Sequence, residues 1–329
     1  MKEVKLPPLK LLNDISNRYQ NIWKYTDEDV KNKDNGLDEW NDTLCYLPIG
    51  YGISILQYYY DVPMFEANIE GSVIVALASW RRDKRIYKFD EQLCNELFDE
   101  SISENFKIPV HIFQQLPAQC IYIQLPDIEC SEEELEDTPD GFFVWIEHDH
   151  RPEYDNLELR IEYINKLGQE LSPYIVHLLP NGTIKDGIDD MLEQSFNNCM
   201  NNFINDAMRV SIQNTINESR KLICNSIQLI LYVCSENADI KEDETQAKIY
   251  RMGQSIKDKY REIRKYNVGL LYAKALRQQE EMKERNIDLG HKKSTHIRQA
   301  HWHHYWIGSG DKKQLVLKWL NSMIINGLN

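Results

Sequence analysis

Between residues 141 and 180 the hydrophobic pattern has a period of two, and this feature constrains the fold more than any other. In its clearest stretch apolar and charged residues alternate in the order Leu157, Glu158, Leu159, Arg160, Ile161, Glu162 and Tyr163. Because successive side chains of a strand point to opposite faces, this order predicts a β-strand with one apolar and one solvated face. Apolar runs at 142–146 and 174–179 predict its neighbours, so we expect an antiparallel meander.

Helical periodicity appears on both sides of this meander. Helices are expected at residues 9–31, 69–80, 90–97, 188–208, 222–233 and 257–285, and short strands at 85–89 and 120–125. This mixture predicts an α+β protein with a mainly antiparallel sheet, a C-terminal β-hairpin that joins the sheet, and helices packed over it. We expect residues 1–65 to form an N-terminal helical region and residues 66–329 to form the α+β domain.

The segment 295–326 concentrates imidazole, indole and guanidinium groups in a pattern that predicts a β-hairpin. Its first strand is expected at 296–307, its turn at 308–311 and its second strand at 314–319. Alternation places one set of side chains on one face: His296, Arg298, Trp302, His304 and Trp306. It places a second set on the other face: Ile297, His301, His303 and Tyr305. The histidines are therefore divided, which disfavours a single metal or catalytic cluster.

Charge is distributed unevenly along the chain, whose net charge is −14. Residues 1–240 hold 20 Lys and Arg against 42 Asp and Glu, a balance of −22. Residues 241–329 hold 18 against 10, a balance of +8. The acidic part repels nucleic acid, whereas the basic part suits phosphate groups or the acidic part of the same chain.

Several enzyme signatures are absent from the sequence. It has no Walker loop, no GxGxxG, no nucleophile elbow and no HExxH, which argues against the enzymes built on them. The seven cysteines form no CxxC pair, so we expect reduced thiols and neither disulfides nor a zinc ribbon. No cofactor is expected. No apolar run reaches the roughly 20 residues of a membrane span, and no signal peptide is recognisable, so a cytosolic protein without a membrane partner is expected.

The hairpin is compatible with three chemical roles. A zinc site is one, with His301 and His303 as two ligands and a third from Glu147, His148 or His150. A metal-independent ribonuclease is the second, with His301 or His303 as general base and Arg298 or Lys318 steadying the phosphorane. The third is plain packing, in which the strand is central, its imidazoles are hydrogen-bonded and its tryptophans lie in the core.

The same segment carries a family resemblance. It contains His296-x-Arg298-x-Ala300-His301-Trp302-His303-x-Tyr305-Trp306-x-Gly308-x-Gly310, followed by Val316-x-Lys318-Trp319 and Ile325-Asn326. Weaker matches in the same order extend upstream to about residue 70, among them Gly141-Phe142-Phe143 and Tyr232-Val233-Cys234-Ser235-Glu236. On these motifs the chain resembles a type V-A anti-CRISPR family with relatives in phages and plasmids. It departs from the common pattern at Ser294-Thr295-His296 and Gln299, where relatives carry Arg-Pro-His and a second Arg.

The resemblance implies an interaction protein that lowers production of the type V-A Cas nuclease. Relatives are understood to recognise the nascent N-terminal peptide of the nuclease during translation and to provoke loss of its mRNA. The implied partners are therefore that peptide and the ribosome or mRNA, in the cytosol of the bacterial host. The expected binding residues are His296, Arg298, His301, Trp302, His303, Tyr305, Trp306, Lys318 and Trp319. A toxin-like ribonuclease that acts on translated message remains the alternative.

Overall fold

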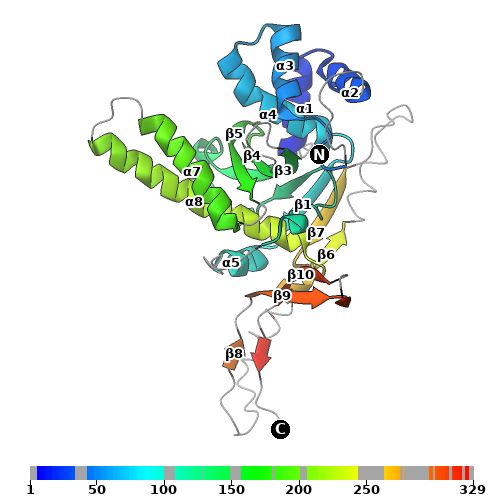
Figure 1. Cartoon of the computed structure of the whole chain (residues 1–329), viewed down its shortest axis with the longest axis vertical. Helices are drawn as coiled ribbons and strands as arrows, with labels where there is room; N and C mark the ends of the chain where they lie inside the picture. The colour runs from blue at the N-terminus through cyan, green and yellow to red at the C-terminus, as the bar shows by residue number, and fades with distance from the viewer. Residues whose placement is uncertain are drawn as a thin grey trace.

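A seven-stranded mixed sheet forms the centre of the protein (Figure 1). The structure is a computed structural model that describes residues 6–33, 43–99, 108–127, 129–148, 157–179, 182–200, 206–243, 263–274, 277, 296–298, 301–310, 313–320 and 323–325. The strands are β1 Arg85–Phe89, β2 Cys120–Gln124, β3 Pro139–His148, β4 Leu157–Asn165, β5 Glu170–Leu178, β6 Ile240–Glu242 and β7 Arg264–Val268.

The sheet runs in the order β5-β4-β3-β2-β1-β7-β6. β1 pairs in parallel with β2 and β7, and the remaining neighbours are antiparallel. The predicted meander at 141–180 is confirmed as β3, β4 and β5. The α+β class with a mainly antiparallel sheet is therefore confirmed.

Helices cover both faces of the sheet (Figure 1). One face is covered by α1 Pro7–Arg18, α2 Ile22–Asn32, α3 Ile49–Tyr60 and α4 Met64–Trp80. The other is covered by α5 Glu91–Asp99, α6 Val110–Phe113, α7 Ile184–Met200 and α8 Asp206–Cys234. A short 3-10 helix, η1, spans Glu132–Glu134. The two faces carry separate apolar cores, because alternate strand residues point to opposite sides.

The N-terminal helices share their core with the sheet. Trp80 at the end of α4 packs edge-on against Phe143 of β3, with ring centroids 5.5 Å apart. The expected boundary between residues 65 and 66 lies within α4, which begins at Met64. The core of this face thus runs without a break from α1 to α4 into β1, β2, β3 and β4.

Two sequence predictions for the central part of the fold are corrected by the structure. Within the charged helix expected at 257–285 the structure has a strand, β7, over Arg264–Val268, where Val268 is buried and Tyr266 stacks on Tyr87 of β1 at 4.9 Å. Residues 270–274 and 277 are helical, as expected. Most of the remainder of 257–285 lies outside the described residues. The face of β4 that was expected to be solvated is buried, since Glu158 and Glu162 are 4% and 2% exposed and Ser72 of α4 contacts Glu162.

The C-terminal hairpin does not join the seven-stranded sheet, contrary to the prediction. β9 His301–Ile307 pairs with β10 Gln314–Leu320, and β8 His296–Arg298 pairs with β11 Met323–Ile325. β8 and β11 continue the antiparallel pairing of β9 and β10 in the same register, since Leu320 opposes His301 and Met323 opposes Arg298. Residues 299–300 and 321–322 between the ladders lie outside the described residues. The hairpin instead contacts the helical layer through its side chains.

Candidate functional site

The β9–β10 hairpin is held to the body by a pair of tryptophans. The indoles of Trp302 and Trp319 meet in a T-shaped contact with ring centroids 5.0 Å apart, at opposed positions of the ladder. Both side chains are buried in the core that includes α8. The indole N–H of Trp302 donates to the side-chain oxygen of Gln228 on α8. A buried Trp that satisfies its N–H in this way fixes the strand as well as filling the core.

Polar contacts complete the attachment of β10. The Asn237 amide donates to the carbonyl of Trp319 at 2.6 Å and accepts from its backbone N–H at 3.2 Å. On the same strand Lys318 forms an ion pair with Glu236 at 3.0 Å, and the ring of His111 bonds the Leu315 carbonyl at 2.9 Å. The position of the hairpin is therefore set by α6, α8 and the turn after α8.

The outer face of β9 presents a row of rings. The His301 and His303 centroids lie 6.3 Å apart, and those of His303 and Tyr305 lie 4.5 Å apart. The ammonium of Lys318 lies 5.8 Å from the centroid of Tyr305. The predicted alternation, with these three rings opposite to Trp302, is thus confirmed. Rings beside a cation form a surface that suits stacking.

The far end of the hairpin extends away from the core. Trp306 is 68% exposed although it lies on the same strand face as Trp302. The turn that follows contains Gly308 at φ +94° and Gly310 at φ +58°, a left-handed conformation that glycine adopts without strain. The tip of the hairpin therefore carries an exposed indole, that of Trp306, next to the exposed Ile307.

The expected binding residues fall into three groups. Trp302 and Trp319 lie in the core, as the packing interpretation held for tryptophans. His303, Tyr305 and Trp306 are exposed, whereas His301 and Lys318 are half-buried. The structure describes the backbone of His296 and Arg298 in β8, and their side chains lie outside its description.

The structure does not assemble the proposed zinc ligands. Within the described residues no three His, Cys, Asp or Glu side chains are grouped as a metal site. Glu147, one expected third ligand, points to the other face of the sheet, His148 ends β3, and His150 lies outside the described residues. For the ribonuclease arrangement, His301 and His303 do share a face. Lys318 beside them is paired with Glu236, so its charge is partly neutralised.

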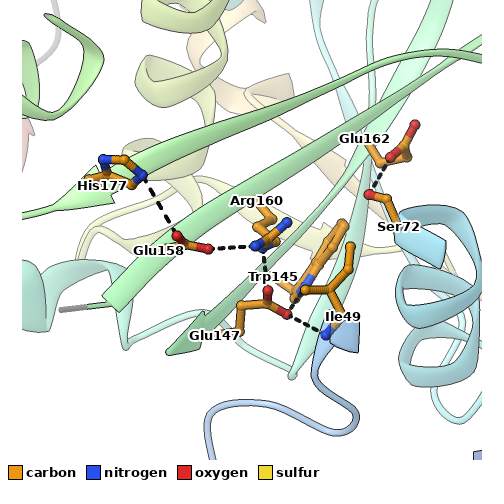
Figure 2. Close-up of polar contacts among 8 residues, drawn as sticks. All are labelled: Ile49, Ser72, Trp145, Glu147, Glu158, Arg160, Glu162 and His177. Carbon is orange, nitrogen blue, oxygen red and sulfur yellow. Dashed lines mark hydrogen bonds and ion pairs between the residues drawn. The ribbon is translucent and has the colours of Figure 1, made fainter. Parts of the chain in front are cut away.

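A buried polar ladder crosses β3, β4 and β5, and the sequence analysis missed it (Figure 2). Glu147, fully buried, forms an ion pair with Arg160, and it accepts from the backbone N–H of Ile49 at 3.3 Å and from the Trp145 indole at 3.4 Å. Ile49 is the first residue of α3, so the carboxylate faces a helix N-terminus, where the dipole favours negative charge. The ladder thus connects α3 to the sheet.

The ladder continues toward the sheet edge. Arg160 donates to Glu158 at 2.6 Å, and Glu158 lies 3.7 Å from the ring of His177 (Figure 2). His177 in turn contacts Asp190 of α7. Like Glu147, these groups lie between elements rather than in an open cleft. The ladder therefore fixes the relation of α3, β4, β5 and α7, and we assign it a structural role.

A second buried carboxylate lies further along β4. Glu162 accepts a hydrogen bond from the Ser72 hydroxyl of α4 at 2.6 Å (Figure 2). Burial raises the pKa of Glu162 to about 8, because a charge in the core loses its hydration. Burial likewise raises the pKa of Glu147 to about 7, although the positive charge of Arg160 acts in the opposite direction. These groups carry a pH-dependent contribution to stability.

Comparison with known proteins adds a family match and a fold match. Residues 87–327 match the family model described as AcrVA2-like, the anti-CRISPR type V subtype A2 family. A solved structure described as the crystal structure of AcrVA2 is similar over 98% of this chain and 99% of that chain, with a TM-score of 0.64 and 16% sequence identity. At that identity the likeness shows the fold alone. A comparison with curated proteins finds no match.

The family match covers the sheet from β1 onward and the whole C-terminal hairpin, as the C-terminal motifs indicated. It begins after α1 to α4, which the structural likeness does include. Of the helices in the described part of the chain, none combines the length and apolar character that a bilayer crossing requires.

Proposed function

Because the chain belongs to the AcrVA2-like family of type V-A anti-CRISPR proteins, we propose that it lowers production of the type V-A Cas nuclease. It does so by recognising the nascent N-terminal peptide of the nuclease and triggering loss of the nuclease mRNA in the bacterial cytosol. The observation that carries the proposal is the family match over residues 87–327, which includes the ring-bearing hairpin.

This function requires two surfaces, and the charge of the chain supplies two different ones. The first 240 residues carry a balance of −22, which suits a peptide with lysine side chains. The remaining residues carry a balance of +8 and include the hairpin, which suits ribosomal RNA or the message. In Figure 1 the hairpin lies at the opposite end of the molecule from α3.

The hairpin surface that we propose for the ribosome or mRNA is the exposed row of rings. His303, Tyr305 and Trp306 offer ring faces to unstacked bases or to aromatic side chains, and single-stranded RNA is bound by such stacking. The half-buried His301 and Lys318 border this row, and we include the β8 residues His296 and Arg298 on the basis of the register. Trp302 and Trp319 act indirectly by holding the strands.

A ribonuclease remains the second candidate, because His301 and His303 lie on one accessible face. An in vitro comparison separates it from the adaptor. The purified chain is incubated with nuclease mRNA in buffer and, in parallel, in a bacterial extract that translates the message. The adaptor predicts message loss in the translating extract alone. Cleavage in buffer that His301→Ala or His303→Ala abolishes supports the ribonuclease and rejects the adaptor.

A further inference from the structure

Large apolar side chains gather on the outside of the α3–α4 helical hairpin. Tyr58 is 80% exposed and Phe65 is 77% exposed, and Met64, Tyr59 and Ile69 beside them are also exposed. Single exposed apolar residues are ordinary on a protein surface, but a contiguous group marks a contact site. We call this group, Tyr58, Tyr59, Met64, Phe65 and Ile69, the α3–α4 patch.

The two helices that carry the patch, α3 and α4, pack in direct contact with each other. A Cβ atom on Gly52 of α3 would lie 2.7 Å from Val75 of α4, and one on Gly71 of α4 would lie 2.8 Å from Ile53 of α3. The glycines thus allow the two helices to cross in direct contact. Below the patch Leu56 is fully buried. The exposed side chains therefore stand on a rigid base.

The rings of the patch are ordered by contacts with α2. Tyr25 stacks on Tyr59 with centroids 3.8 Å apart and planes within 5°. Tyr58 meets Tyr59 edge-on at 4.8 Å. Tyr58 and Tyr59 therefore lose little further conformational freedom when a partner binds, which favours affinity.

Carboxylates surround the patch. From residue 49 to residue 80 the chain contains Asp61, Glu66 and Glu70 and no Lys or Arg. Asp29 and Glu28 lie on α2, the helix whose Tyr25 stacks on Tyr59. Desolvation and these two carboxylates raise the pKa of Tyr59.

Some of this negative charge is already compensated. Glu70 pairs with Arg18 at 2.9 Å, and Glu28 pairs with Lys24 at 3.7 Å. Among the described residues no cation pairs with Asp29, Asp61 or Glu66. Carboxylates thus remain for a partner.

We propose that the α3–α4 patch is a docking surface for a polypeptide segment that carries Lys or Arg next to apolar side chains. Ring faces and carboxylates together attract ammonium and guanidinium groups, and the apolar area is covered by the neighbouring side chains of the segment. A nucleic acid is repelled by the same carboxylates, and a second copy of this chain brings like charges together. Resting on the proposed function, this inference assigns nascent-peptide recognition to a surface outside the residues of the family match.

Binding of synthetic peptides to the purified full chain tests the docking surface. The probes are a copy of the nuclease N-terminal peptide and two designed peptides of equal length, one alternating Lys with Leu and one alternating Glu with Leu. We expect the chain to bind the Lys–Leu peptide at least tenfold more tightly than the Glu–Leu peptide. The charge-neutral double variant Tyr58→Ser, Phe65→Ser weakens that binding at least tenfold.

Two further variants sharpen the test. Leu271→Ser removes an exposed leucine just after β7 and leaves peptide binding unchanged. Asp61→Lys combined with Glu66→Lys shifts the preference toward the Glu–Leu peptide. Since all substituted side chains are exposed, unaltered circular dichroism and melting temperature establish that the variants are folded.

Several outcomes overturn the inference. They are equal binding of the two designed peptides, unchanged binding by the double variant, or a concentration-dependent dimer that the double variant abolishes. The proposed function fails separately, if the chain binds the Lys–Leu peptide through the patch but neither binds the nuclease peptide nor lowers nuclease production. If production falls equally with wild type and double variant while peptide binding is also equal, the patch assignment is wrong and the function stands.

Discussion

The indole of Trp302 packs edge-on against the indole of Trp319, with an interplanar angle of 63°, and the same Trp302 indole bonds Gln228, which holds the hairpin to α8. Strand β9 of the hairpin therefore has two roles. Its inner residues hold it to the body, and its outer rings and exposed tip remain available for a partner. Anchoring by the inner residues, partner binding by the outer rings and the stability of the buried ladder can each be tested separately.

Replacing Trp319 with Ala is expected to destabilise the protein by about 3–5 kcal/mol, because the side chain is 1% exposed and its removal leaves a cavity. Urea-induced unfolding of both proteins measures this difference. The control is Trp306→Ala on the exposed tip, with an expected change of less than about 0.5 kcal/mol. Equal losses for the two variants contradict the division between anchoring and exposed tryptophans.

Replacing Tyr305 and Trp306 together with Ala is expected to weaken association with translating ribosomes at least fivefold without changing the melting temperature. Both rings are exposed, so their loss removes stacking partners and little core. Co-sedimentation of the purified chain with ribosomes that translate nuclease mRNA gives the bound fraction. The matched control is Ser309→Ala, which changes an exposed, uncharged residue of the same hairpin. If the double variant sediments like the wild type, the row of rings is not the ribosome-facing surface.

The stability of the protein is expected to fall as pH rises from about 5 to about 8.5. The folded-state pKa of Glu162 is about 8 against an ordinary value of 4.5, so in this interval the folded state holds a proton that the unfolded state releases. Glu162→Gln keeps the acceptor for Ser72 and removes the titration. Relative to wild type, the variant should gain on the order of a few kcal/mol at pH 8.5 and little at pH 5.

Unfolding midpoints in urea at the two pH values measure this linkage. Glu133→Gln on the exposed helix η1 serves as control and should follow the wild-type profile. A wild-type profile that is steady or rises over the interval contradicts the buried protonated carboxyl.

Replacing Arg160 with Met is expected to cost about 3–5 kcal/mol, because it leaves the carboxylates of Glu147 and Glu158 buried without their cation. Adding Glu147→Gln to this variant removes one unpaired charge and should recover part of the loss. A double-mutant cycle measured by denaturant unfolding reports the coupling of the pair. Strictly additive losses argue against a direct interaction between Arg160 and Glu147.

The sequence was sufficient to predict the meander and most helices, because their apolar periods are long and regular. It was misleading for the charged face of β4. Alternating Glu158, Arg160 and Glu162 usually indicates a solvent-exposed face. Here Arg160 pairs with Glu158, Glu158 lies near the ring of His177, and Glu162 bonds Ser72 of α4. Whether a charged strand face of this kind is exposed to solvent depends on how the helices pack in the tertiary structure.

Two further features depended on long-range contacts. Strand β7 lies in a charged stretch and was not predicted, because its strand conformation depends on pairing with β1, about 180 residues earlier in sequence. The hairpin strands were recognisable from alternation and turn glycines, whereas their separation from the central sheet was not. The exposed run at the end of α3 was visible as Tyr58-Tyr59-Tyr60, but a run of tyrosines alone does not show which rings are buried.

The most direct test of the central claim is the steady-state level of nuclease mRNA in bacteria that express this chain. Two nuclease genes are compared: one with native N-terminal codons, and one with compensating frameshifts that change the N-terminal peptide but almost none of the nucleotides. We predict that the chain depletes the native message at least fivefold and leaves the frameshifted message unchanged. Equal depletion of both messages, or depletion of neither, would contradict recognition of the nascent peptide.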